Sequence, residues 1–126
     1  MSRPERAVVA DNEAARAFAA QLPVTLDMPD LNGNEKHVHL PEPLPTDLTK
    51  PGTIRAGDLL LWGDDTLVLF YETFRSSYSY TRLGKLDDPK GLAEAVGSIR
   101  AEGHMTLRAV AKQMNERGIL TRHSRR

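Results

Sequence analysis

The pattern of apolar and polar positions is clearest over residues 57–86, where it predicts three β-strands. Residues 59–62 are apolar throughout and residues 66–71 are nearly so. A glycine and two aspartates at positions 63–65 separate them, which is the composition of a tight turn. The two segments therefore predict an antiparallel hairpin whose near-continuous apolar character implies burial on both faces. Residues 80–86 are expected to form a third strand, after a loop rich in serine and tyrosine.

The residues before this segment predict a helix followed by two extended pieces. The Asp-Asn pair at positions 11–12 can cap a helix, and the apolar residues that follow recur at a spacing of four. Pro23 cannot continue the backbone hydrogen bonding, so we expect the helix to stop near Gln21. Residues 24–28 alternate between apolar and polar, which predicts a half-buried strand. Residues 35–40 are interpreted as a second extended piece.

Three further segments lie before and after these strands. Residues 41–52 hold four prolines, a density that excludes a helix or a central strand and predicts a wrapping loop. After the third strand, Pro89 near the start and Gly97 near the end delimit a predicted short helix. From Thr106 to Gly118 the apolar spacing predicts another helix, with Thr106 as its N-cap.

Composition limits the classes of protein. At 126 residues the chain is one domain, or one domain with an appendage. It has no cysteine, which excludes disulfides and thiolate-bound metals. Because no apolar run approaches the roughly 20 residues of a membrane span and the start of the chain is charged, we expect a cytoplasmic protein with no membrane partner. The net charge is zero, but residues 100–126 hold seven lysines or arginines and two glutamates.

Four sequence segments are similar to a bacterial family of small cyclophilin-like proteins. They are DNEAARAFAAQLPVTLDM, LNGNEKHVHLPEPLP, AGDLLLWGDDTLVLFYETFRSSYSYTRLGKLDDP and GLAEAVGS. The resemblance covers about residues 11–98 and implies a mainly β fold, a small β-barrel with short helices closing its ends. It implies no particular reaction, because members of this group generally have no established activity and fold does not fix function.

Both ends of the chain depart from that family pattern. Only residues 6–10 correspond to the usual first strand. The usual last strand would have to be residues 98–101, cut short by the Glu-Gly-His that follows, so we expect an open sheet edge. Beyond it, the segment TLRAVAKQMNERGILTRHSRR resembles a helix and turn of large serine recombinases. We therefore predict a cyclophilin-like domain over residues 1–101 and an added basic, helical C-terminal extension over residues 102–126.

The loop between the second and third strands is the predicted ligand site. Its serine hydroxyls and amphipathic tyrosine rings are suited to contacting ligands, and loops on a rigid barrel commonly carry binding. The alternative is a loop that packs its tyrosines down as a barrel lid. We predict a groove for a small molecule or short peptide, with the ligand-binding residues Tyr71, Ser76, Ser77, Tyr78, Tyr80, Arg82 and Glu35.

Prolyl isomerisation is the alternative that the resemblance suggests. Cyclophilin isomerases hold proline in an apolar pocket beside an arginine, and Arg55, Arg75 and Arg82 are the candidates here. The competing interpretation places Phe70 and Trp62 in the core and Arg82 on the surface. The arginine-containing stretch of true isomerases has no counterpart in the chain, so we predict no catalytic residue.

Metals, cofactors and macromolecular partners are predicted as follows. Glu35, His37 and His39 alternate on one face of a strand, which could supply three metal ligands, but the same pattern is typical of a solvated face. Aspartate pairs at 64–65 and 87–88 are best interpreted as turn and cap residues. We predict no metal and no cofactor.

The basic C-terminal tail could bind nucleic acid through salt-sensitive contacts, and the chain is expected to be a monomer or a homodimer.

Overall fold

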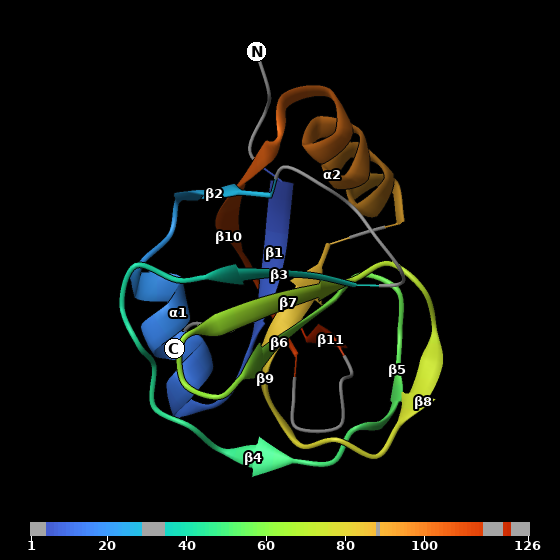
Figure 1. The fold of residues 1–126 in the computed structure, drawn as a ribbon. Helices are drawn as coiled ribbons and strands as arrows, with labels where there is room; N and C mark the ends of the chain where they lie inside the picture. Colours follow the sequence, from blue (N-terminus) through green and yellow to red (C-terminus); the bar gives the residue numbers. More distant parts are fainter. Residues whose placement is uncertain (1–4, 29–34, 88, 115–119, 122–126) are drawn as a thin grey trace.

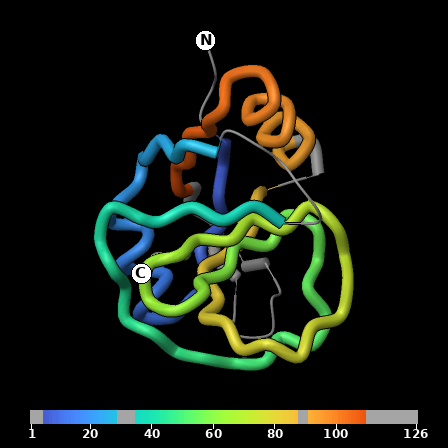
Figure 2. The backbone as a smooth tube through the Cα atoms, in the orientation of Figure 1, coloured from blue at the N-terminus to red at the C-terminus, as the bar shows by residue number. Residues whose placement is uncertain are grey.

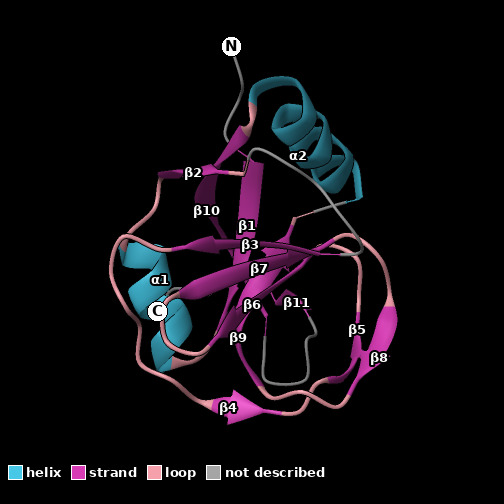
Figure 3. Ribbon diagram, viewed as in Figure 1, coloured by secondary structure: helices cyan, strands magenta, loops and turns pink. Residues whose placement is uncertain are grey.

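A computed structural model describes residues 5–28, 35–87, 89–114 and 120–121 of the chain. Strands form most of it, and two helices lie at different ends of the sheet (Figures 1 and 3). The elements are β1 (Glu5–Ala10), α1 (Glu13–Ala20), β2 (Val24–Asp27), β3 (Glu35–His39), β4 (Leu48–Thr49), β5 (Gly52–Ile54), β6 (Asp58–Trp62), β7 (Thr66–Phe70), β8 (Phe74–Ser76), β9 (Tyr80–Leu86), α2 (Pro89–Glu102), β10 (His104–Met114) and β11 (Leu120–Thr121).

The main sheet is barrel-shaped and nearly closed, as the sequence predicted. Its strand order among the described residues is β11-β10-β1-β9-β6-β7-β3, with β2 beside β10 and β4 beside β9. Strand β1 pairs antiparallel with β9 and parallel with β10. The short strands β5 and β8 form a separate pair. No helix of the described part of the chain is long and apolar enough to cross a membrane.

Helix α1 closes one end of the barrel and begins where the sequence predicted. The Asn12 side-chain oxygen accepts a hydrogen bond from the Ala15 backbone N–H at 2.7 Å, the N-cap contact of a helix. The Asn12 amide nitrogen donates to the Arg82 carbonyl oxygen at 2.9 Å. Phe18 is completely buried in the core. The cap residue therefore both starts the helix and ties it to β9.

The β6–β7 hairpin is buried on both faces, which confirms the interpretation of its apolar sequence. On one face Leu59, Leu61, Leu67 and Leu69 join the main core inside the barrel. On the other face Leu60, Val68 and Phe70 join a second, smaller cluster. Strand residues alternate between faces, so a continuous apolar run requires cover on both sides. Figure 2 shows the chain from Leu40 to Ile54 running round the margin of the molecule, as the predicted wrapping loop.

The helix predicted from Thr106 is wrong, because residues 104–114 form strand β10. This strand pairs with β1 and with β2, so the predicted open edge beside β1 is also wrong. Met105 and Leu107 are buried while Arg108 is exposed, a period of two that the helical interpretation overlooked. Pairing on both sides overrides the local helix propensity of the segment.

Helix α2 is longer than predicted and includes residues 98–101, which were expected to be a strand. It ends at Glu102, and Gly103 follows with a positive φ of 78°. The Gly103 N–H donates to the Ile99 carbonyl oxygen at 2.7 Å, and the Gly103 carbonyl accepts from the Met28 N–H at 2.6 Å. Gly103, and not Gly97, is therefore the glycine that ends this helix.

Gly84 marks the closest approach of two strands. It lies in β9 opposite Val9 of β1, and a Cβ there would overlap the Val8 carbonyl oxygen and come within 3.0 Å of the Val9 Cα.

We expect Gly84→Ala to destabilise the protein by about 3 kcal/mol, because backbone atoms must move. Gly97→Ala is the matched control. Nothing lies within 4 Å of that Cβ, so it should stabilise α2 by about 0.5–1 kcal/mol. Urea unfolding measures both, and equal stabilities would contradict the close approach.

Asp58, the first residue of β6, carries a buried carboxylate next to the preceding turn. It is 6% exposed, and its Oδ2 accepts a hydrogen bond from the Arg55 N–H at 2.9 Å. Burial raises the pKa of Asp58 above 3.8, and the hydrogen bond from Arg55 and the charges of Arg82, Arg55 and Lys85 only partly oppose this. The folded protein therefore holds this proton more tightly than the unfolded chain does.

This raised pKa predicts a pH-dependent difference between the protein and its Asp58→Asn variant. Between the folded pKa of Asp58 and the unfolded value of 3.8, the folded protein binds a proton that the unfolded chain does not. Lowering the pH through this window therefore favours folding of the wild type. The asparagine variant lacks that contribution. The melting temperature of the wild type should therefore rise relative to that of Asp58→Asn as pH falls through this window. Asp58→Ala loses the turn hydrogen bond and should cost about 1 kcal/mol. If the difference in melting temperature between the wild type and Asp58→Asn stayed constant from about pH 7 to about pH 4, the raised pKa would be contradicted.

Candidate functional site

The outer face of the main sheet carries a small apolar cluster that is only partly covered. Its buried members are Ile54, Leu60, Val68, Phe70 and Tyr80, with Phe74 packed against them. Strands β5 and β8 contribute Ile54 and Phe74, and the main sheet contributes the rest. In Figure 1 the β5–β8 pair lies to one side of β6 and β7. The remainder of this face stays open beside the pair.

A groove of about 610 Å³ occupies this open part. Strand β3 forms one side, β7 and Trp62 form the floor, and β8 with the following loop forms the other side. Its lining residues among those described are Glu35, His37, Val38, His39, Trp62, Thr66, Val68, Phe74, Ser76, Tyr78 and Tyr80. The volume lies in the range of roughly 300–1,000 Å³ that is usual for small-ligand sites.

Aromatic rings in mutual contact make up much of the groove. The Trp62 ring lies 5.8 Å from that of Tyr78, with the two planes at 89°, and 5.7 Å from that of Tyr80. Phe70 connects Tyr80 to Phe74 below, at 5.7 and 5.6 Å. Such edge and tilted contacts are the favoured geometries for aromatic pairs. Trp62 and Tyr78 are nevertheless 47% and 63% exposed, so their rings are available to a ligand.

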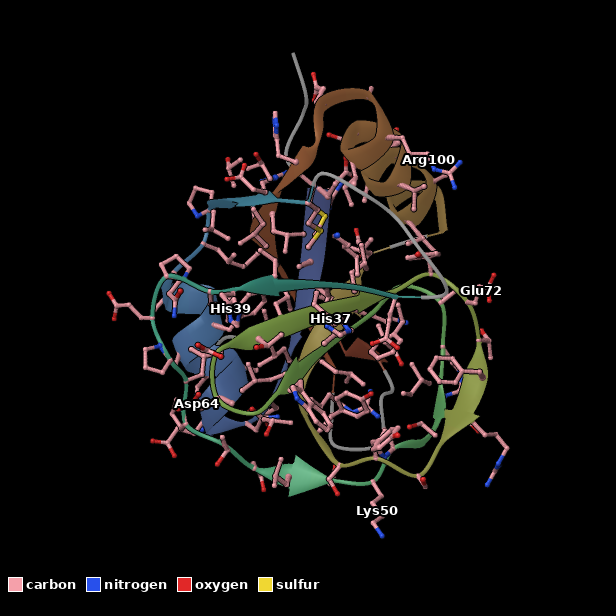
Figure 4. The ribbon with its side chains drawn as sticks, viewed as in Figure 1. His37, His39, Lys50, Asp64, Glu72 and Arg100 are labelled. Carbon is pink, nitrogen blue, oxygen red and sulfur yellow. The ribbon has the colours of Figure 1, made fainter. Side chains whose placement is uncertain are left out.

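Polar side chains gather on the β3 side of the groove. His37 Nε2 lies 2.6 Å from Glu35 Oε1. His39 Nδ1 lies 3.3 Å from the Thr66 hydroxyl and 3.5 Å from Asp65 Oδ1. Figure 4 shows both histidines along β3, in front of β7. Within the described part of the chain no three acidic, histidine or cysteine side chains are grouped so that they could hold a metal.

Tyr71 and Tyr80 have raised pKa values, and the Glu35 charge contributes to both. Burial is the main cause of the raised pKa of Tyr80, and the Glu35 charge adds to it while a side-chain hydrogen bond with Ser76 opposes it. Burial also raises the pKa of Tyr71, with the charges of Glu72 and Glu35 adding to it and that of Arg100 opposing it. Both hydroxyls therefore stay protonated at neutral pH, as hydrogen-bond donors rather than anions.

The structure brings some of the predicted site residues together and leaves others out. Glu35, Ser76, Tyr78 and Tyr80 line the groove. The Ser76 hydroxyl also accepts from the Tyr78 N–H at 3.1 Å, which holds the loop. The other three, Tyr71, Ser77 and Arg82, are not among the described lining residues. Tyr71 instead makes a long hydrogen bond of 3.5 Å to the Glu35 carbonyl oxygen. The ligand-binding role of each stays a prediction.

Sequence reasoning missed Trp62 and the two histidines as groove residues. Trp62 ends an apolar strand, which suggests a core position. Its side chain lies on the opposite face of the sheet from that of Leu61, in the part of this face that β5 and β8 leave open, and it is exposed. The interpretation that places Trp62 in the core is therefore wrong, whereas Phe70 is fully buried. The alternation of Glu35, His37 and His39 did place them on one face, but the pattern could not show that this face meets the aromatic rings.

The candidate arginines for isomerase chemistry do not meet this groove. None of Arg55, Arg75 and Arg82 is among its described lining residues. Asp64 and Asp65 are turn residues, as predicted, and their carbonyl oxygens accept from the N–H groups of Leu44 and Leu40. Asp88 lies outside the described residues. Asp87 pairs with Arg6 at 3.4 Å.

Comparison with known proteins agrees with this architecture. The model of the cyclophilin-like family matches residues 4–108, so the chain belongs to the cyclophilin-like family. The matched region runs from the residue before β1 into β10. No curated protein and no solved structure matches the chain. The family supplies the fold, and the site has to be argued from its own residues.

Tyr78 and Tyr80 should differ sharply in their effect on stability. Tyr80 is 5% exposed and belongs to the outer-face cluster, so Tyr80→Ala should cost about 3–5 kcal/mol. Tyr78 is mostly exposed, and Tyr78→Ala should cost no more than about 1 kcal/mol, the value of its edge contact with Trp62. Urea unfolding of both variants tests this contrast. Equal losses would show that Tyr78 is also a core residue.

Proposed function

We propose that this protein is a binding domain that takes a small molecule or a short peptide into the groove beside β3. The observation that carries the proposal is the uncovered aromatic surface formed by Trp62 and Tyr78 above a buried cluster. Large apolar side chains left open next to polar ones are typical of interaction sites. Few polar groups in a mainly apolar groove are also typical of sites that orient a ligand.

The position of the groove supports binding on a rigid scaffold. Its floor is the β6–β7 hairpin, whose core-facing leucines are completely buried. Tyr80 and Phe74 are fixed by their packing in the outer-face cluster. Tyr78 alone among these rings is mostly exposed. A ligand would therefore meet a preformed wall with one adaptable aromatic side chain, and little ordering would be needed on binding.

Trp62 provides a direct test because it is the only tryptophan of the chain and lines the groove. We expect at least one class among neutral, anionic and cationic small molecules and short peptides to change its fluorescence and to raise the melting temperature. Tyr78→Ala should weaken that binding about tenfold, the effect of losing one stacked ring, while Tyr78→Phe retains it.

Arg16→Ala serves as the control, since this exposed residue of α1 lies outside the described lining and its loss should leave the affinity unchanged. Circular dichroism of each variant checks that it is folded. Binding that persists unchanged in Tyr78→Ala would contradict this location, and a complete screen without any response of Trp62 would contradict the function.

Prolyl isomerisation and nucleic-acid binding are not proposed from the structure. No arginine is found among the described residues of the groove, and an arginine is what the isomerase interpretation requires. Residues 122–126 of the basic tail lie outside the described part of the chain. Nucleic-acid binding through the tail stays a prediction from charge alone.

A further inference from the structure

The described lining of the groove holds a carboxylate and neither lysine nor arginine. Among the described residues that line the groove, Glu35 is the single carboxylate. Asp65 adds a second carboxylate beside His39 at the rim. The two ionised carboxylates can balance a charge on each of the two histidines. In Figure 4 the labelled cations Lys50 and Arg100 lie well away from His37 and His39.

The aromatic rings have a matching electrostatic character. The faces of tryptophan and tyrosine rings are negative and attract organic cations, with tryptophan the strongest. Trp62 and Tyr78 stand with their planes at 89°, and Tyr80 and Phe74 line the same groove. A group inside it therefore meets several aromatic side chains and one carboxylate. Such a combination favours a positively charged, weakly hydrated head group.

We propose that the groove selects ligands carrying an alkylated ammonium group, which sits against Trp62 and Tyr78 with its charge toward Glu35. This inference rests on the proposed function and names its ligand class. An anion would be repelled by Glu35. A neutral apolar ligand would remove water from the carboxylate without replacing it, which is costly for a charged group.

Glu35 retains the capacity for such a contact. A carboxylate offers about four acceptor positions on its two oxygens, and the contact with His37 at 2.6 Å uses Oε1. Its charge also reaches the aromatic wall, since it contributes to the raised pKa of Tyr80. Glu35 and the aromatic rings line the same groove.

Choline and its uncharged analogue dimethylbutanol, in which carbon replaces the nitrogen, test the proposal directly. The two have nearly the same shape and differ in charge. We expect Trp62 fluorescence titration and calorimetry of the full chain to show choline binding about tenfold more tightly, in line with the strength of a cation–π contact. Equal affinity for the two compounds would overturn the inference, because the groove would then recognise shape alone.

Two variants assign the selectivity to the named residues. Glu35→Gln should weaken choline binding by about three- to tenfold and leave dimethylbutanol unchanged, because only the charged ligand gains from the carboxylate. Glu72→Gln removes the same charge from an exposed residue outside the described lining and should change neither affinity. Tyr78→Leu keeps apolar surface but removes the ring, so it should weaken choline more than dimethylbutanol. Equal effects on the two ligands in Glu35→Gln and Tyr78→Leu would overturn the assignment.

The experiment separates failure of this inference from failure of the proposed function. If neither compound binds while the general screen identifies an anionic or uncharged ligand that responds to Tyr78→Ala, the groove binds ligands but the ammonium assignment is wrong. If no ligand of any class changes Trp62 fluorescence, the binding function itself fails, and the ammonium assignment fails with it.

Discussion

Burial of the β6–β7 hairpin on both faces is the constraint on which the rest of the structure depends. Alternate leucines enter the barrel interior, and Leu60, Val68 and Phe70 face the other way. An apolar face left in water would cost about 25 cal/mol for each square ångström, so each face needs its own cover. The barrel closes over the first. Strands β5 and β8 cover the second only in part, and the groove lies where that cover ends.

Closure of the barrel depends on a strand that is distant in sequence. Strand β10 joins β1 in parallel and β2 antiparallel, and a parallel pair needs a long connection between its strands. The far side of the sheet path ends at β3, where Glu35, Lys36 and two histidines occupy the strand. Charged and polar residues at such an edge discourage pairing with another chain. The residues that protect this edge also form the polar side of the groove.

The sequence was sufficient for elements whose signals are local. Asn12 fixed the start of α1, and the apolar runs fixed β6, β7 and β9. It failed for β10, because Met105 and Leu107 fit a strand while the residues from Thr106 onward also fit a helix. Only pairing with β1 and β2 decides between them. The site could be predicted only in part for the same reason. The tyrosines were visible as a loop cluster, but the placement of His37 and Trp62 in one groove is a property of the folded sheet.

Tyr80 links the stability of this fold to the shape of the groove. Its ring packs on Phe70 in the outer-face cluster and on Trp62 in the groove, so one side chain serves both. The cluster holds Tyr80 in place, and Tyr80 in turn supports the exposed ring of Trp62. Selection for a stable hairpin therefore preserves the groove wall as a consequence. The exposed positions of the groove, Tyr78 and the outward residues of β3, can change at little cost to the core, because exposed side chains contribute little to its burial.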